Sequence, residues 1–136
     1  MTRILLVEDN RADAILLQEA LRAADVSSPV DHVTDGEQAL AHLRETDTPP
    51  GLMLLDLNLP RMDGREVLAT VKGDPELRDI PVIILTTSSA PKDVELAYSR
   101  GANAFVRKPL GMDRLVEAAA SIRDFWLRTA TLPSEA

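Results

Sequence analysis

Cysteine is absent from this 136-residue chain, which excludes disulfide bonds and thiolate metal sites. Long apolar runs are absent too, so we expect no membrane span. Basic residues are scarce, since 15 Lys and Arg stand against 22 Asp and Glu, and the net charge is -7. Nucleic acid requires a basic face, so we expect no nucleic-acid binding. The absence of cysteine is compatible with a reducing compartment, and we expect a cytoplasmic protein.

A glycine-rich phosphate loop is also missing. Nucleotide-binding folds carry this loop after their first strand, where residues 8–12 of this chain read Glu-Asp-Asn-Arg-Ala. A nucleotide-binding module is therefore excluded.

Length and composition fit a single domain with a core of its own. We expect this domain to cover residues 1–128, with residues 129–136 as a C-terminal tail and no output domain. The chain leads almost directly into an apolar strand, so we expect no signal peptide.

Strand and helix patterns alternate along the chain. This alternation predicts an α/β fold, a single doubly wound parallel sheet of five strands with five helices on its two faces. The expected strands are residues 3–8, 30–34, 52–56, 81–86 and 103–107. The expected helices are residues 10–25, 35–46, 64–73, 91–101 and 111–129.

The most informative segment is residues 52–64, in which four apolar residues run into Asp56 and a turn follows at once. A short apolar run bounded by turn signals predicts a central strand that is buried on both faces. Open α/β folds bind ligands at the carboxyl edge of the sheet. We therefore expect Asp56 to lie in a crevice at that edge.

Polar residues end three further strands. Glu8 and Asp9 end the first strand, Thr86 ends the fourth, and Lys108 follows the fifth. Three carboxylates at one edge repel each other unless a cation intervenes, and oxygen ligands with room for water suit Mg²⁺. An Asp beside Mg²⁺ and a lysine predicts phosphoryl transfer, in which Asp56 attacks in line and becomes an aspartyl phosphate.

The set Glu8-Asp9, Asp56, Thr86 and Lys108-Pro109 resembles the receiver domain of two-component response regulators, over residues 3 to about 125. This resemblance implies the flavodoxin-like strand order 2-1-3-4-5. It also implies a sensor histidine kinase as the partner. The resemblance further implies that the chain is not an enzyme in the usual sense, because it would catalyse only its own phosphorylation and dephosphorylation.

The resemblance implies a role for each site residue. Asp56 would accept the phosphoryl group, Lys108 would pair with that group, and Thr86 would be the switch hydroxyl. Phe105 would be the switch aromatic. The implied metal ligands are Glu8, Asp9, Asp56 and the backbone carbonyl of Asn58.

A finer resemblance is to small stand-alone regulators that are paired with bacterial phytochromes. It rests on Val7-Glu8-Asp9-Asn10, Leu85-Thr-Thr-Ser-Ser and the ending Phe125-Trp126-Leu127. It implies a light-controlled histidine kinase as the phosphoryl donor. Without an output domain, the signal would pass by protein–protein contact or by a phosphorelay.

Two alternatives stay open. A small phosphatase of the haloacid dehalogenase type also uses an Asp at a strand end, but that class needs an acid two residues later, where this chain has Asn58. A receiver could also act only as a phosphate sink.

Two local expectations concern the edge of the site. The Lys108–Pro109 bond is expected to be cis, because a tight turn there would bend the lysine into the acidic site. Asn10 either caps the first helix or lines the site.

On the first helix, an apolar stripe is expected to face the core, and Ile15 projects nearly opposite to it. The stripe comprises Leu16, Leu17, Ala20, Leu21 and Ala24. We expect Ile15 to be exposed. With Gln18 and Arg22, it would form a docking face for the kinase, as the resemblance suggests.

The C-terminal end is expected to mediate a homodimer. Phe125, Trp126 and Leu127 run past the usual end of a receiver's last helix, and together they would form a poor solvent surface. We expect them to pack against the same segment of a second chain, with Leu132 and Pro133 adding contact. The alternative is that the segment folds back onto its own chain.

Overall fold

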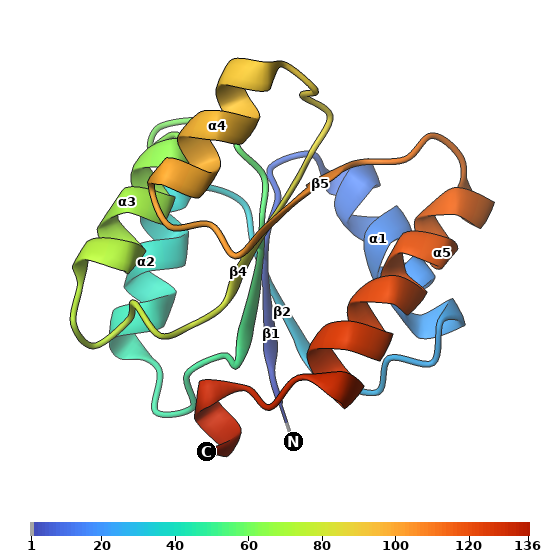
Figure 1. Ribbon diagram of the computed structural model, residues 1–136, viewed down its shortest axis with the longest axis horizontal. Helices are drawn as coiled ribbons and strands as arrows, with labels where there is room; N and C mark the ends of the chain where they lie inside the picture. Colours follow the sequence, from blue (N-terminus) through green and yellow to red (C-terminus); the bar gives the residue numbers. More distant parts are fainter. Residues whose placement is uncertain (1) are drawn as a thin grey trace.

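A computed structural model describes residues 2–136, and it contains one parallel sheet of five strands (Figure 1). The strands are β1 (Ile4–Val7), β2 (Val30–Val33), β3 (Leu52–Leu55), β4 (Val82–Thr86) and β5 (Ala104–Arg107). Their order in the sheet is β2-β1-β3-β4-β5, and every neighbouring pair is parallel. The expected fold class and strand order are confirmed.

The helices also lie where the sequence predicts them, with ends that differ by a few residues. They are α1 (Arg11–Ala23), α2 (Gly36–Glu45), α3 (Gly64–Gly73), α4 (Pro91–Ser99) and α5 (Met112–Ile122). The last helix is the exception. Its α-helical part ends at Ile122, and a π-helical segment, η1, continues over Arg123–Thr129. No helix among residues 2–136 is long and apolar enough to cross a membrane.

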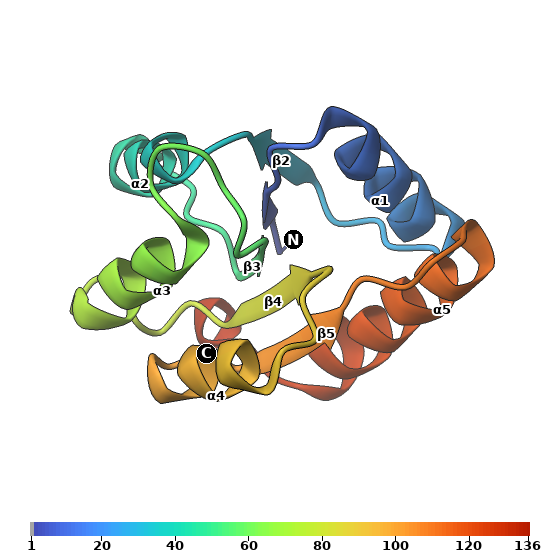
Figure 2. The ribbon, with the colours of Figure 1, turned by 90° about the horizontal axis from the view of Figure 1, so that it is seen from above.

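Helices cover the sheet on both faces, with α2, α3 and α4 on one side and α1 and α5 on the other (Figures 1 and 2). Successive strand side chains alternate between these two layers. Leu5, Val7 and Leu55 pack with α2 and α3, whereas Ile4 and Leu54 pack with α1 and α5. Because β1, β3 and β4 are buried along their whole length, the sheet is a rigid support for the residues at its edge.

Helix α1 buries a narrower stripe than the sequence predicts. Leu17, Ala20 and Leu21 are buried, but Leu16 is 45% exposed and does not belong to the core. At about 100° per residue, Leu16 lies about 90° from the centre of the stripe, at its margin. Ile15 is 49% exposed, which confirms the expectation for that residue.

The C-terminal end folds back onto its own chain. Trp126 and Leu127 are partly buried against the core beneath α1 and α5, while Phe125 stays 54% exposed. The Phe125 and Trp126 rings meet edge to face, with their centroids 5.1 Å apart. Backbone bonding of the π type, from the Ala130 N–H to the Phe125 carbonyl at 2.7 Å, closes the segment.

The last residues are not a loose tail. Leu132 is 1% exposed, and a short 3₁₀ turn follows at Pro133–Glu135. This turn lies beside residues 49–51 and near Thr2, at the edge of the sheet where the strands begin (Figure 1). The expected contribution of Leu132 to a dimer is therefore wrong, because its side chain is already buried within the chain.

Candidate functional site

Four polar residues meet at the carboxyl edge of the sheet. Glu8 follows β1, Asp56 follows β3, Thr86 ends β4, and Lys108 follows β5. All four strands are parallel, so their carboxyl ends lie at the same edge. Glu8, Asp56 and Thr86 are 2%, 7% and 0% exposed. The structure thus brings together the strand-end residues that the sequence singled out.

The backbone around Asp56 is held by a close approach of α3. A Cβ atom on Gly64 would lie 2.1 Å from the Asp56 carbonyl oxygen, so only glycine fits there. The Gly64 N–H also donates to the Leu57 carbonyl at 3.0 Å. The loop after β3 is therefore anchored at both its ends, which fixes the position of Asp56.

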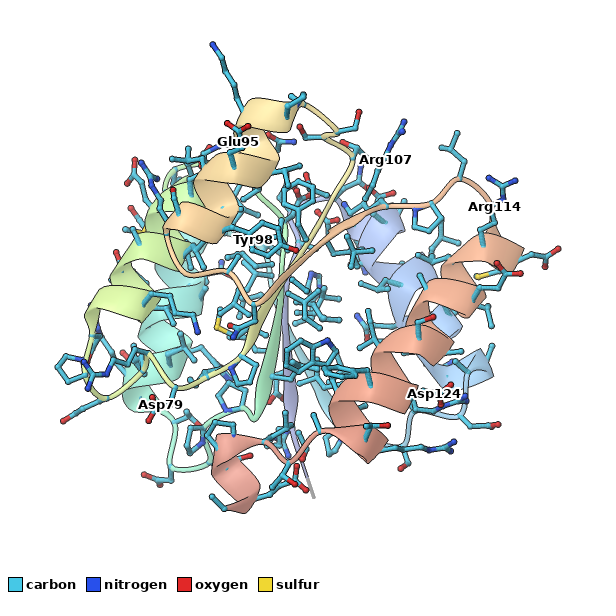
Figure 3. The ribbon with its side chains drawn as sticks, in the orientation of Figure 1. Asp79, Glu95, Tyr98, Arg107, Arg114 and Asp124 are labelled. Atoms are coloured by element: carbon cyan, nitrogen blue, oxygen red, sulfur yellow. The ribbon has the colours of Figure 1, made fainter. Side chains whose placement is uncertain are left out.

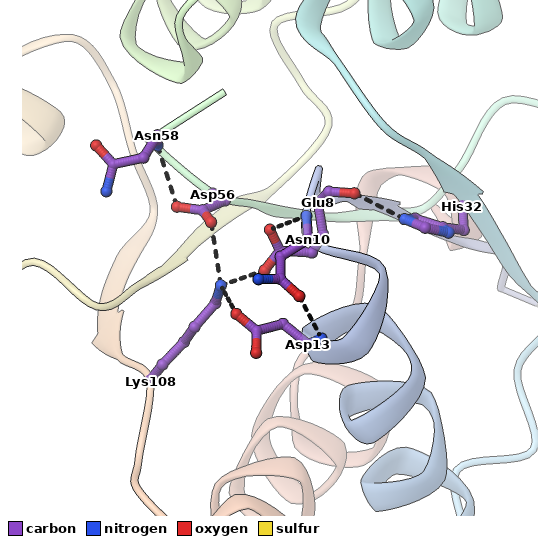
Figure 4. A network of polar contacts seen from close by, with 7 residues as sticks. All are labelled: Glu8, Asn10, Asp13, His32, Asp56, Asn58 and Lys108. Atoms are coloured by element: carbon purple, nitrogen blue, oxygen red, sulfur yellow. Dashed lines mark hydrogen bonds and ion pairs between the residues drawn. The ribbon is translucent and has the colours of Figure 1, made fainter. Parts of the chain in front are cut away.

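One ammonium group connects the carboxylates (Figure 4). Lys108 Nζ donates to Asp56 Oδ2 at 3.0 Å and to Glu8 Oε1, and it lies 3.4 Å from Asp13 Oδ2. The lysine side chain is only 13% exposed. A single half-buried cation is thus shared among three carboxylates, which leaves the cluster with excess negative charge.

The expectation of a cis Lys108–Pro109 bond is wrong. No peptide bond among residues 2–136 is cis, yet Lys108 still reaches Asp56. The reason is that the Lys108 N–H donates to the Thr86 carbonyl at 2.7 Å, so pairing with β4 continues beyond β5. The lysine leaves the strand already directed at the site, and the chain bends later, at Gly111, whose φ is 90°.

The other oxygen of Asp56 is bound as well. The Asn58 N–H donates to Asp56 Oδ1 at 3.1 Å. The side chain of Asn58 points away from the cluster (Figure 4), so only its backbone faces Asp56. Such local N–H donation favours the charged form of a carboxylate.

The acidic residues have the arrangement that a divalent cation needs. One carboxylate oxygen from each of Glu8, Asp9 and Asp56 can be chosen so that all three lie within 4.8 Å of one another. Asp9 is exposed, whereas the other two are buried. Oxygen ligands with an open, wet side suit a hard cation, and its charge would offset the excess negative charge of the cluster.

Thr86 has a buried hydroxyl without a partner. Within residues 2–136, its Oγ1 is the one buried side-chain polar atom that makes no hydrogen bond. A buried hydroxyl without a bond costs free energy, on the order of 1–3 kcal/mol. Such a group at a sheet edge lined with charged residues is suited to donate to an anionic oxygen of a ligand.

Asn10 and Asp13 have roles that the sequence left open or did not indicate. Asn10 Oδ1 accepts from the Asp13 N–H at 3.0 Å, so Asn10 caps α1. Asp13 contacts Lys108, and sequence reasoning missed it. Its spacing was a usable signal, because a residue three positions after an N-cap lies in the first turn, facing the same edge as the strand ends.

The ionisation of the cluster follows from burial and from its neighbours. Burial alone would raise the pKa of Asp56, but the Asn58 N–H and Lys108 outweigh it and hold that pKa below its usual value. Burial opposes the charge of Lys108, yet Glu8 and Asp56 raise its pKa. Burial, together with the charge of Asp56, raises the pKa of Glu8 to about 7. Asp56 is thus the carboxylate that stays ionised.

The other expected residues lie away from this cluster. Phe105 on β5 is partly buried against the α2–α4 layer, and its N–H donates to the Tyr98 hydroxyl at 3.0 Å. Figure 3 shows Tyr98 reaching from α4 toward β5. Gln18 is half-buried and Arg22 is exposed, on the same helix as Ile15.

An apolar groove that the sequence did not indicate lies beside the lysine. It has a volume of 110 Å³ and is lined mainly by Leu16, Leu17, Pro109, Met112 and Leu115. Leu110, which lies between Pro109 and Gly111 in the chain, is 88% exposed. Exposed apolar residues therefore cluster between α1 and the start of α5, next to the acidic site.

Residues 4–120 match the family described as the response regulator receiver domain. The chain is 43% identical to response regulator Rcp1 of Synechocystis sp. (strain ATCC 27184 / PCC 6803 / Kazusa), and the match covers 96% of this chain and 92% of Rcp1. The crystal structure of the Mn(2+)-bound form of Rcp1 has a TM-score of 0.89 and 41% identity, over 98% of this chain and 99% of that one.

Two further crystal structures are similar over almost the whole chain. The phosphorylated cyanobacterial phytochrome response regulator RcpA is 45% identical, with a TM-score of 0.91 over 97% of this chain and 98% of that one. Response regulator RPA3017, in red light signaling of R. palustris, is 38% identical, with a TM-score of 0.91 over 98% and 99%.

The pKa of Glu8 predicts how the metal-free protein responds to pH. Between about pH 4.5 and pH 7 the folded state keeps a proton on Glu8 that the unfolded chain has lost, so the free energy of unfolding should fall as pH rises. The expected loss is on the order of 2 kcal/mol. Asp56→Asn removes a negative charge next to Glu8, so this variant should lose less stability than the wild type as pH rises.

Urea unfolding in EDTA at pH 5 and pH 7.5 measures this loss, with Glu8→Gln as the control that removes it. At pH 7.5 we expect Asp56→Asn to be as stable as the wild type or slightly more stable. A large decrease in its stability would contradict the expected repulsion between the two carboxylates.

Proposed function

Because the chain belongs to the response regulator receiver domain family, we propose that it accepts a phosphoryl group from a histidine kinase onto Asp56. The observation that carries this proposal is the contact at 3.0 Å between a buried, ionised Asp56 and the Lys108 ammonium group. Asp56 is a nucleophile in place, and Lys108 is a cation placed to meet the phosphoryl oxygens.

The transfer can be written from the residues at the sheet edge. An Asp56 oxygen attacks the phosphorus of a phosphohistidine, a P–O bond forms, and the P–N bond breaks. The electron pair of that bond stays on the imidazole nitrogen. Lys108 exchanges its contact with the carboxylate for one with the new phosphoryl oxygens, and the Thr86 hydroxyl gains the acceptor that it lacks.

We propose Mg²⁺ as the metal, held by Glu8, Asp9, Asp56 and the backbone carbonyl of Asn58. When bound, the cation neutralises negative charge on the transferring phosphoryl group. The three carboxylates fit it by their spacing, and the relative Rcp1 has a Mn(2+)-bound form. Asn58 also bears on the phosphatase alternative, because it supplies no acid two residues after the nucleophile.

We propose a bacterial phytochrome, or a kinase controlled by one, as the phosphoryl donor in the cytoplasm. The support is that RcpA is a phytochrome response regulator and RPA3017 acts in red light signaling, both at 38% identity or more. The proposed outputs are contact with a partner protein or a phosphorelay. A phosphate sink is the outcome if the phosphorylated chain binds no partner.

We propose that the kinase docks on α1 and the start of α5. Ile15, Gln18 and Arg22 were the residues expected from the sequence, and the exposed Leu16, Leu110 and Met112 extend that surface to the mouth of the site. Apolar residues exposed together usually mark an interaction surface. This surface borders Lys108, so a docked kinase can present its phosphohistidine to Asp56.

We also propose a homodimer through the end of α5 and η1. Phe125 is the exposed member of the aromatic pair, while Trp126 and Leu127 support it from within. A two-fold axis would bring two Phe125 rings together. The alternative is that this segment serves only as a lid on its own chain.

Phosphorylation can be tested with acetyl phosphate and Mg²⁺, followed by intact mass. The wild type should gain one phosphoryl group, and Asp56→Asn should gain none. Omitting Mg²⁺ should reduce the labelling strongly. Repeated turnover of small phosphate esters would instead favour the phosphatase, and labelling of Asp56→Asn would show that another residue accepts the group.

Docking can be tested with Ile15→Glu and Leu16→Glu. Each places a charge on the proposed surface, so transfer from the cognate kinase should slow by about tenfold or more. Labelling of the same variants by acetyl phosphate is the control, because that reaction needs no docking. Normal transfer from the kinase to both variants would remove the docking role.

Sedimentation at micromolar concentration tests the dimer. The wild type should sediment as a dimer and Phe125→Glu as a monomer, with Ile15→Glu, equally exposed on another face, as the control. The double variant Trp126→Ala with Leu127→Ala should also sediment as a monomer. Its free energy of unfolding should be lower than that of the wild type, because both side chains pack against the core. A monomeric wild type would show that the segment is only a lid.

A further inference from the structure

Helix α4 is weakly anchored. Ala97 is its only buried residue among residues 91–99, and its N-cap, Ala90, has no side chain that can bond the free N–H groups of the first turn. Low burial and an uncapped end are features of elements that open easily. The start of α4 must therefore be held by other contacts.

Those contacts form a clasp of three side chains, Ser88, Asp93 and Arg65. The Ser88 hydroxyl donates to Asp93 Oδ2, and Arg65 Nη2 donates to Asp93 Oδ1 at 2.8 Å. Arg65 Nη1 also donates to both oxygens of Asp63, at 3.1 and 3.2 Å. The guanidinium group thus links the first turn of α3 to the first turn of α4.

Both ends of the clasp lead to the phosphorylation site. Ser88 lies two residues after Thr86, on the segment that joins β4 to α4. At the other end, Arg65 binds Asp63, which is the N-cap of α3, and the adjacent Gly64 packs against the Asp56 carbonyl. The chain of contacts therefore runs from the backbone of Asp56 to the segment that directly follows Thr86.

The ion pair at the centre of the clasp is partly shielded from water. The Arg65 and Asp93 side chains are 23% and 24% exposed. The bond from Ser88, followed by the one from Arg65, lowers the pKa of Asp93, and the bond to Asp93 raises the pKa of Arg65. Both groups are therefore charged at neutral pH, and the ion pair between them is formed there.

We propose that Arg65 is a positioning residue that, through Asp93 and Ser88, holds the segment after β4 so that the Thr86 hydroxyl stays in place for a phosphoryl oxygen. This inference rests on the proposed function. Thr86 Oγ1 is buried without a partner, so a relaxed segment would let the hydroxyl turn to a backbone acceptor. The clasp prevents that relaxation, and Arg65 touches no reacting atom itself.

The test is the rate at which acetyl phosphate labels Asp56 with Mg²⁺ present, followed by quenched intact mass. Arg65→Gln and Asp93→Asn should each slow labelling by about threefold to tenfold. The labelling rate of Arg65→Lys should lie between the rates of the wild type and Arg65→Gln, because an ammonium group cannot bind both carboxylates as a guanidinium group does. Arg3→Gln is the matched control, because it breaks a similar ion pair with Asp31 on the edge strand β2.

A double-mutant cycle shows whether the effect passes through Thr86. In a Thr86→Ala background, Arg65→Gln should have no further effect on the rate. Equal slowing in both backgrounds would mean that Arg65 acts on the fold in general and would overturn the inference. If Arg65→Gln is labelled at the same rate as the wild type, the inference is overturned too. The proposed function would then still stand, because the wild type is labelled.

Hydrogen exchange of the metal-free protein gives a readout that does not depend on phosphorylation. Amides of residues 87–94 should exchange faster in Asp93→Asn than in the wild type, and Arg3→Gln should leave them unchanged. Unchanged exchange in Asp93→Asn would overturn the inference. A wild type that takes up no phosphoryl group at all would overturn the proposed function, and the inference with it.

Discussion

The shared contact of Lys108 with Glu8 and Asp56 is the interaction on which the site depends. Two acids at the ends of buried strands would repel each other, and burial would drive protons onto both. The Asn58 N–H and the lysine together hold the pKa of Asp56 below its usual value, whereas burial and the charge of Asp56 raise the pKa of Glu8 despite its contact with the lysine. The rigid sheet makes this arrangement possible, since β1, β3 and β4 fix where each carboxylate lies.

Much of this fold could be predicted because its strands are buried on both faces. Such strands read as short apolar runs, and the residue after each run is placed at the sheet edge, as for Asp56 and Glu8. Features that depend on tertiary packing were harder to predict from the sequence. Leu16 lies at the margin of a helical stripe, where the packing of neighbouring helices decides burial. The end of α5 looked like a continuous helix, because π bonding beyond Ile122 leaves no clear mark in the sequence.

Errors near the site have a common physical origin. The direction of a side chain at a strand end depends on how far pairing with the next strand continues, and the pairing of Lys108 with Thr86 removed the need for a cis bond. Asp13 was missed because it reaches the cluster from a helix, across the space between two elements. The set of strand-end residues was predictable from the chain, whereas their contacts required the packing.

Because of its position, Trp126 can serve as an intrinsic fluorescent probe. It is the only tryptophan in the sequence, and its side chain packs against the core and makes an edge-to-face contact with the Phe125 ring. Its emission therefore reports on the π-helical segment without an attached dye. Any event that covers or frees the Phe125 ring changes the surroundings of this single fluorophore.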